Sequence, residues 1–260
     1  MSNNFHQAPP PAANYLLSCP PSDEYAQLAP NLRRVRLGLG DVLGRASNDL
    51  AHAYFPTTCV VSLICDMENG ATTEVALTGN DGVLGTSLFL GGNTATNRAI
   101  VGIAGEALRI EARILKDQFT RGGTFQHVLL RYTEALITQI SLTAACNRMH
   151  TLEKRLSRWL LLIHDRTTSN QFVMTQEFIA NMLGGRRETV TVAAGHLQDA
   201  GLIQYTRGRL TIVNRKGLEN TVCECYRPFN REEQAAVGAL DAAHCVHNLL
   251  PRARASDALR

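Results

Sequence analysis

The chain has 260 residues, of which 45% are hydrophobic and 19% are charged. These values are ordinary for a globular protein and argue against global disorder, a coiled coil or a collagen-like repeat. No apolar run approaches the roughly 18 residues that a membrane-spanning helix needs, and residues 1–30 lack the basic start and apolar stretch of a signal peptide. We therefore expect a cytoplasmic protein with no membrane partner, built as two modest domains or one large one.

The net charge of +3 is distributed unevenly along the chain. Residues 148–216 hold eleven Lys and Arg against five Asp and Glu, a local charge of +6, which leaves −3 for the remainder. Such asymmetry indicates that this region meets a polyanion. A basic face that is merely solvated is the alternative.

The seven cysteines are scattered and odd in number, which predicts reduced thiols rather than a disulfide framework. The tightest pair is Cys223 and Cys225, and His244, Cys245 and His247 follow about twenty residues later. Because no regular CxxC cluster is present, we predict no metal site. We also find no arrangement of nucleophile and base that would indicate an enzyme.

The residue composition and the spacing of apolar residues change near residue 31. Residues 1–30 contain two proline clusters and few periodic apolar positions, as is typical of a flexible segment. Residues 31–124 hold short β-branched runs separated by turn residues, which predict a small antiparallel barrel or roll. The expected strands lie at 58–65, 73–77, 98–103 and 107–110.

A long helix is predicted at 125–150, because proline and glycine are absent from 125–149. Apolar residues recur at seven-residue spacing in two adjoining rows, one through Leu136 and the other through Ile137. We expect one row to lie on the barrel and the other to pair with the same helix of a second subunit. A central core helix without a partner is the alternative. The expected dimer contacts are Leu129, Leu136, Ile140 and Thr143.

The pattern of residues 151–222 predicts a winged helix-turn-helix. Thr175 is a good N-cap for a first helix, which Gly184 and Gly185 end. A second helix runs to Gly201, and two short strands with a basic turn form the wing. A plain helical hairpin without a DNA-binding role is the alternative.

The start of the second helix carries side chains suited to reading DNA. Arg can donate two hydrogen bonds to guanine, Glu can accept one from cytosine, and Thr can contact a thymine methyl group. Arginines at the wing tip are placed to bind phosphates. The recognition helix is expected at about Arg186–Ala200. The expected DNA-binding residues are Thr175, Gln176, Arg186, Arg187, Glu188, Thr189, Thr191, Arg207 and Arg209.

These motifs resemble those of the Crp/Fnr family of bacterial transcription regulators over about residues 31–222. The helix-turn-helix signature is matched by the run from Thr175 to Val190 and by Leu197-x-x-x-Gly201-Leu202-Ile203. The family's sensor roll is matched by Gly79-x-x-Gly82-x-x-Gly85 and Arg98-Ala99-x-Val101. The resemblance implies an α+β fold with an N-terminal antiparallel β-roll of the cyclic-nucleotide-binding type, a long dimerisation helix and a C-terminal winged helix-turn-helix. It also implies a homodimer on palindromic double-stranded DNA, with RNA polymerase as a further candidate partner.

The sequence differs from that of nucleotide-binding family members at the positions that contact the cyclic nucleotide. Nucleotide-binding members carry a Glu for the ribose and an Arg for the cyclic phosphate. Here Val83 stands at the Glu position, and Arg98 lies one place out of register. A phosphate without a positioned charge binds poorly, so we expect no cyclic AMP and no other cofactor. The candidate effector-pocket residues are Gly82, Val83, Leu84, Gly85, Arg98 and Ala99.

Two functions remain open at this point. The first is a dimeric transcription regulator whose β-roll has lost the usual cyclic-nucleotide chemistry. The second is a small-molecule or redox sensor, with ligand or thiol chemistry at the roll or at Cys223 and Cys225, and DNA binding as its output. The expected regions are a flexible segment at 1–30, the β-roll at 31–124, the dimerisation helix at 125–150, the DNA-binding domain at 151–222 and a C-terminal tail at 223–260.

Overall fold

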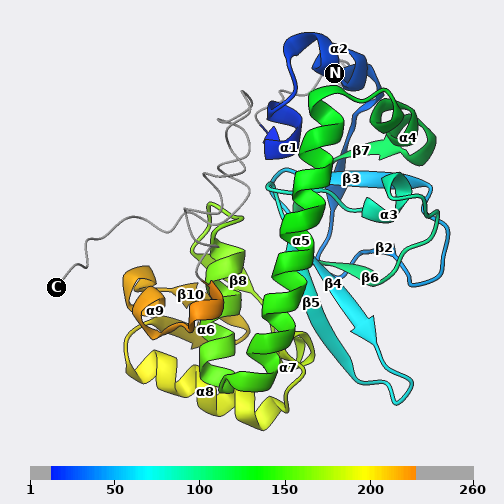
Figure 1. Cartoon of the computed structure of the whole chain (residues 1–260). Coiled ribbons are helices and arrows are strands. Elements are labelled where there is room, and N and C mark those ends of the chain that lie inside the picture. Colours follow the sequence, from blue (N-terminus) through cyan, green and yellow to red (C-terminus); the bar gives the residue numbers. More distant parts are fainter. Residues whose placement is uncertain (1–12, 227–260) are drawn as a thin grey trace, which may run out of the picture.

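The computed structural model describes residues 13–226, which form two lobes joined through one long helix, α5 (Figure 1). A β-rich lobe lies along α5, and a smaller, mainly helical lobe lies near the C-terminal end of that helix. The α+β fold predicted from the sequence, with an antiparallel roll, a long helix and a winged helix-turn-helix, is confirmed. None of the helices in the described part of the chain has the length and apolar character that crossing a membrane requires.

The β-rich lobe is an antiparallel roll made of two sheets. The first sheet has the strand order β1 (Arg33–Leu37), β7 (Gly105–Glu111), β3 (His52–Pro56). The second has the order β2 (Val42–Gly44), β6 (Arg98–Ile103), β4 (Val60–Asp66), β5 (Thr72–Thr78). A short helix, α3 (Thr86–Phe89), follows the second sheet's β5 in the chain. The interior of the roll contains the fully buried residues Cys59, Val61, Val101 and Ala107.

The segment before the roll is not the flexible lead-in that its prolines predict. It forms α1 (Tyr15–Ser18), α2 (Ser22–Leu28) and the 3₁₀ turn η2 (Ala29–Asn31). Leu16 and Leu17 are fully buried in a core shared with the roll and α5, and this apolar burial stabilises the docked segment. The prediction for 1–30 is therefore wrong over the described residues 13–30, and residues 1–12 lie outside them.

Helix α4 (Ala112–Thr120) leads into α5 (Gly123–Met149), which begins two residues before the expected start. One side of α5 packs on the roll and on the N-terminal helices. The other side leaves Leu130 and Ile137 exposed by 45% and 60%. The buried residues of α5 are Phe125, Val128, Leu129, Tyr132 and Cys146.

The second lobe begins with α6 (Leu152–His164) and contains the helix-turn-helix. Its remaining helical elements are α7 (Gln176–Leu183), α8 (Arg187–Asp199), α9 (Arg215–Thr221) and the 3₁₀ turn η3 (Glu224–Tyr226). Its antiparallel sheet has the order β8 (Gln171–Val173), β10 (Arg209–Ile212), β9 (Ile203–Thr206). The sequence predicts β9 and β10 but not β8, because three residues carry too little pattern to identify a strand.

One apolar core extends across both lobes. Val60, Ile64 and Leu77 of the roll belong to the same buried cluster as Trp159 of α6 and Ile179 of α7. Because this core is continuous, the second lobe packs directly on the second sheet of the roll.

Candidate DNA-binding interface and sensor site

Helices α7 and α8 form the helix-turn-helix. The Thr175 hydroxyl accepts a hydrogen bond of 3.0 Å from the Phe178 N–H and so caps α7. Gly184 ends α7 with φ +57°, a left-handed conformation that glycine adopts without a steric penalty. The buried face of α8 packs into the lobe through Val190, Ala193, Ala194 and Leu197.

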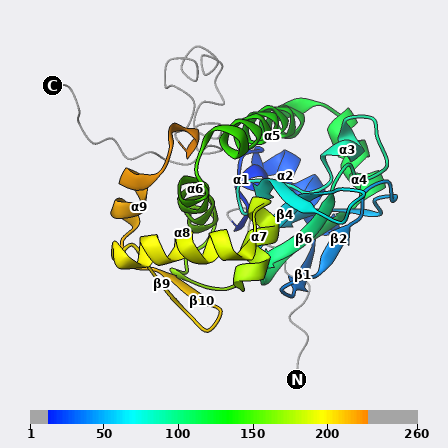
Figure 2. The same cartoon turned by 90° about the horizontal axis from the view of Figure 1, so that it is seen from below.

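The opposite face of α8 is open to solvent. Arg186, Arg187, Glu188, Thr189 and Thr191 are all exposed at its N-terminal end, as the sequence predicts. Figure 2 shows α8 running across the outer surface of the lobe with the β9–β10 hairpin projecting near it. Within residues 13–226, neither Arg186 nor Arg187 forms an ion pair. Both side chains are therefore available to an external anion.

The wing presents two further arginines. The hairpin turn consists of Arg207 and Gly208, whose φ angles are +50° and +77°. Positive φ at both positions is the type I′ geometry that suits a two-residue hairpin. Arg207 and Arg209 are exposed at this tip, which places two positive charges on the projecting part of the lobe.

Three of the predicted DNA-binding residues, Thr175, Gln176 and Thr191, also hold the motif together. Besides the cap made by Thr175, the Thr191 hydroxyl donates to the Gln176 side-chain oxygen at 2.9 Å and links α8 to α7. Val192, which the sequence analysis did not include, is exposed beside Thr191. An apolar side chain there is suited to contact a thymine methyl group.

The candidate effector pocket is a small cavity inside the roll, with a volume of about 50 Å³. Ligand sites generally occupy about 300–1,000 Å³. Four predicted residues line it, namely Val83, Leu84, Gly85 and Ala99.

Gly82 and Arg98, the other two predicted pocket residues, do not line this cavity. Arg98 of β6 instead forms a hydrogen bond with Asp66 of the neighbouring strand β4. Its Nε donates to a carboxylate oxygen at 2.7 Å. This hydrogen bond raises the pKa of Arg98 and lowers that of Asp66. Gly82 lies against Tyr132 of α5. A Cβ at this position would be only 2.4 Å from the ring, so no larger side chain fits there.

The predicted dimer residues are divided between the interior and the surface. Leu129 is fully buried within the protomer, so its assignment to a subunit interface is wrong. Leu136, Ile140 and Thr143 are half-buried. The solvent-facing apolar row is the adjoining one, through Leu130, Ile137 and Ala144.

A cluster that the sequence analysis missed lies at the junction of α5, α6 and η3. Cys146, His150, Cys223 and Cys225 bring their ligand-capable atoms within 4.8 Å of one another. The sequence signals are a Cys-x-x-x-His and a Cys-x-Cys, but more than seventy residues separate them. Cys223 and Cys225 therefore belong to the packed lobe rather than to a tail, and the predicted tail beyond residue 226, with His244, Cys245 and His247, lies outside the described residues.

Comparison with known proteins identifies the type of helix-turn-helix. Residues 154–221 match the Crp-like helix-turn-helix domain. No curated protein sequence matches the chain.

Solved structures share the fold at low sequence identity. FixK2 from Bradyrhizobium japonicum is 16% identical with a TM-score of 0.63, and the match covers 74% of this chain and 98% of that one. TTHB099, a CRP-family transcriptional regulator from Thermus thermophilus, is 17% identical with a TM-score of 0.61 and coverages of 72% and 95%. CLP, a c-di-GMP-responsive global regulator from Xanthomonas campestris, is 14% identical with a TM-score of 0.56 and coverages of 74% and 99%. At these identities the likeness establishes the fold alone.

Proposed function

We propose that this chain, a Crp/Fnr-family protein by its fold and its Crp-like helix-turn-helix domain, is a sequence-specific DNA-binding transcription regulator rather than an enzyme. The observation that carries the proposal is the exposed N-terminal end of α8, where Arg186 and Arg187 have no ion-pair partner among the described residues. The N-terminal residues of a recognition helix contact base edges in the major groove. Arg187 and Glu188 read bases in this proposal.

The arginines of the wing support the same mode of DNA binding, with α8 in the major groove. Arg207 and Arg209 project from the β9–β10 hairpin near α8 (Figure 2). Contacts to phosphates fix the register of a protein on the duplex without carrying sequence information. We therefore assign Arg207 and Arg209 to the DNA backbone.

The functional unit in this proposal is a homodimer formed through α5. Leu130 and Ile137 expose a row of apolar surface that no described residue of the same chain covers. A second copy of α5 has the matching heptad spacing and buries this row. Two recognition helices then face half-sites about 34–36 Å apart on a palindromic operator.

We further propose that DNA binding does not depend on cyclic AMP. Val83 offers no hydrogen bond to a ribose, Arg98 is held by Asp66, and the cavity of about 50 Å³ is small for a nucleotide. The alternative function, a thiol or small-molecule sensor with DNA binding as its output, would use Cys223, whose sulfur lies 3.6 Å from that of Cys146.

The proposal is tested by selecting binding sites from a random double-stranded DNA pool with the purified full chain and no added effector. Enrichment of palindromic sites with half-site centres one helical turn apart is expected. Enrichment only after a ligand or an oxidant is added would favour the sensor alternative. A pool without any enriched sequence would contradict the proposed function.

A further inference from the structure

We propose that Cys146, His150, Cys223 and Cys225 bind one Zn²⁺ ion and thereby fasten the DNA-binding lobe to the C-terminal end of α5. Cys146 and His150 lie about one helical turn apart, so both face the same side of that helix. Cys223 and Cys225 flank the start of η3 after the winged helix. The four ligands therefore come from two segments that the fold brings together.

The spacing of the four side chains fits a tetrahedral zinc site. With Zn–S bonds of about 2.3 Å and Zn–N bonds of about 2.0–2.1 Å, ligand atoms are separated by about 3.8 Å for two sulfurs and about 3.6 Å for sulfur and nitrogen. The Cys146 and Cys223 sulfurs are 3.6 Å apart. The Cys225 sulfur is 3.6 Å from Nδ1 of His150. Small side-chain shifts suffice to place all four atoms around one ion.

The chemistry and burial of the cluster favour a structural site. Cys146, Cys223 and Cys225 are exposed by only 1%, 3% and 8%. Three thiolates with one imidazole form a Cys₃His set, which is a closed four-coordinate set in structural zinc sites. Zinc binding takes the thiols in their deprotonated form and releases their protons, so no oxidant or reductant is needed.

Neighbouring groups orient and neutralise the ligands. Nε2 of His150 lies 3.4 Å from a carboxylate oxygen of Glu224, which leaves Nδ1 facing the sulfurs. A carboxylate behind the histidine is the usual support of a zinc ligand. The buried Arg158 donates to the backbone oxygen of Cys225 at 3.1 Å. Its positive charge offsets the net charge of −1 that one Zn²⁺ and three thiolates carry.

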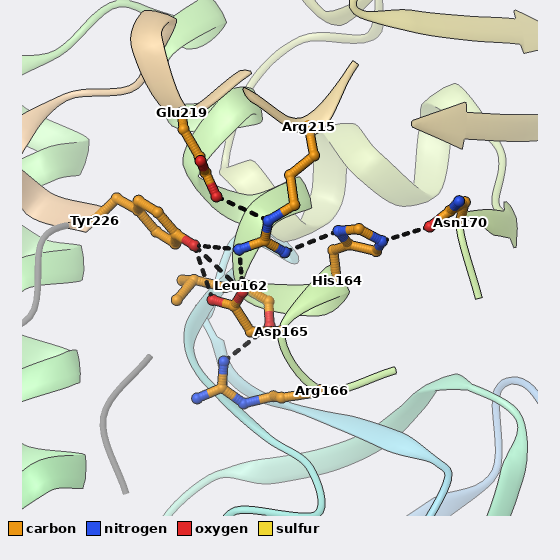
Figure 3. Close-up of polar contacts among 8 residues, drawn as sticks. All are labelled: Leu162, His164, Asp165, Arg166, Asn170, Arg215, Glu219 and Tyr226. Atoms are coloured by element: carbon orange, nitrogen blue, oxygen red, sulfur yellow. Dashed lines mark hydrogen bonds and ion pairs between the residues drawn. The ribbon is translucent and has the colours of Figure 1, made fainter. Parts of the chain in front are cut away.

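The residue after the Cys-Glu-Cys segment, Tyr226, is anchored by polar contacts that involve no metal, and Figure 3 shows them. The Tyr226 hydroxyl lies 2.8 Å from a guanidinium nitrogen of Arg215 and 3.1 Å from Asp165. Arg215 in turn bonds Asp165 at 2.6 Å and Glu219 at 2.8 Å. This network ties η3 to α9 and to the C-terminal end of α6, so η3 is positioned without a metal ion.

The test uses the full chain and the metals alone, without DNA, so its outcome is separate from that of the proposed function. Elemental analysis after purification with Zn²⁺ and exhaustive dialysis should give one zinc per chain. Cys223→Ser and Cys225→Ser should each lose it, whereas Cys65→Ser, at a half-buried thiol of the roll, should retain it. Cys245→Ser, at a cysteine outside the described residues, should also retain it.

Two further readouts guard against variants that merely misfold. After chelation, Co²⁺ titration of the native chain should give the intense visible absorption of tetrahedral thiolate coordination. His150→Cys should keep the ion through four cysteines, while His150→Ala should weaken its binding. Glu224→Gln should weaken Zn²⁺ binding about 10–100-fold, because it removes only the group behind the histidine.

Three results would overturn the proposal. The first is the absence of both zinc and a tetrahedral Co²⁺ spectrum in the folded native chain. The second is zinc that persists when Cys146, Cys223 and Cys225 are replaced together. The third is a Cys146–Cys223 disulfide in the protein purified under reducing conditions, because that bond would remove two ligands and indicate a redox function instead.

Discussion

The indole nitrogen of Trp159 donates a hydrogen bond of 2.9 Å to a carboxyl oxygen of Glu74, across the boundary between the helical lobe and the roll. Both side chains are buried, with exposed fractions of 4% and 6%. Burial raises the pKa of Glu74 to about 7, although the Ser62 hydroxyl, which lies next to the Glu74 carboxyl, acts to lower the pKa of that group. The lobe contact therefore contains a carboxyl group that titrates near neutral pH.

This buried carboxyl predicts that the chain is more stable in mild acid than in mild base. Between the ordinary pKa of 4.5 and the folded value of about 7, the folded chain binds more protons than the unfolded chain. Its free energy of unfolding should therefore fall as the pH rises through this window. A shift of this size corresponds to on the order of 3 kcal/mol. Urea denaturation at pH 5, 6, 7 and 8 measures the trend.

The variant Glu74→Gln shows how much of the pH dependence of stability comes from Glu74 rather than from other titrating groups. The neutral amide keeps an acceptor for Trp159 and has no charge to desolvate, so the variant should be more stable than the native chain at pH 8 and close to it at pH 5. Glu68→Gln, at an exposed turn position, should follow the native pH profile. Parallel profiles for the native chain and Glu74→Gln would rule out this role of Glu74.

Gly82 packs directly against the ring of Tyr132 on α5. Because an added Cβ would meet the Tyr132 ring at 2.4 Å, Gly82→Ala should destabilise the fold by about 1–3 kcal/mol. Gly195→Ala, in the middle of α8 with no atom within 4 Å of the new Cβ, should instead stabilise it by up to about 1 kcal/mol. Thermal denaturation compares the two variants, and a neutral Gly82→Ala would contradict the packing role.

The dimer seam is predicted to run through Leu130 and Ile137. Replacing both with Glu would bury unpaired carboxylates between two helices, where each costs several kcal/mol. Sedimentation should then show monomers that retain the native helical content. Leu39→Glu, at an apolar position that is 50% exposed and lies outside α5, should remain dimeric. If the double variant also sedimented as the native dimer, the interface would lie elsewhere.

Cyclic AMP is predicted to leave DNA affinity unchanged. The loss of one charge-assisted hydrogen bond costs on the order of 1.5–3 kcal/mol, and both the ribose acceptor and the free phosphate arginine are missing from this roll. Calorimetry should detect no binding at millimolar nucleotide. Stoichiometric binding at micromolar nucleotide would show that Arg98 leaves Asp66 to reach the phosphate.

The sequence predicts well where local pattern decides structure. The capped helix that starts after Thr175, its stop at Gly184 and the exposed arginines of α8 all follow from short-range signals. Contacts between distant segments leave no such signal. The docking of Leu16 and Leu17, the closeness of Gly82 to Tyr132 and the meeting of Cys146 with Cys223 depend on how the lobes pack.

The sequence pattern likewise does not determine which of the two apolar rows of α5 is buried within the protomer. Two adjoining rows have equal periodicity, and only the packed roll determines which one is covered. Leu129 is taken into the protomer core, while Ile137 is left outside.

Arg187→Ala and Arg209→Ala together distinguish base reading by α8 from contacts of the wing with the DNA backbone. Binding to the selected site and to random DNA is measured across a salt series. Arg187→Ala should cost about 1–3 kcal/mol on the selected site only and relax preference at one base pair. Arg209→Ala should weaken both DNAs alike and flatten the salt slope by about one unit. Intact sequence preference in Arg187→Ala would contradict the account.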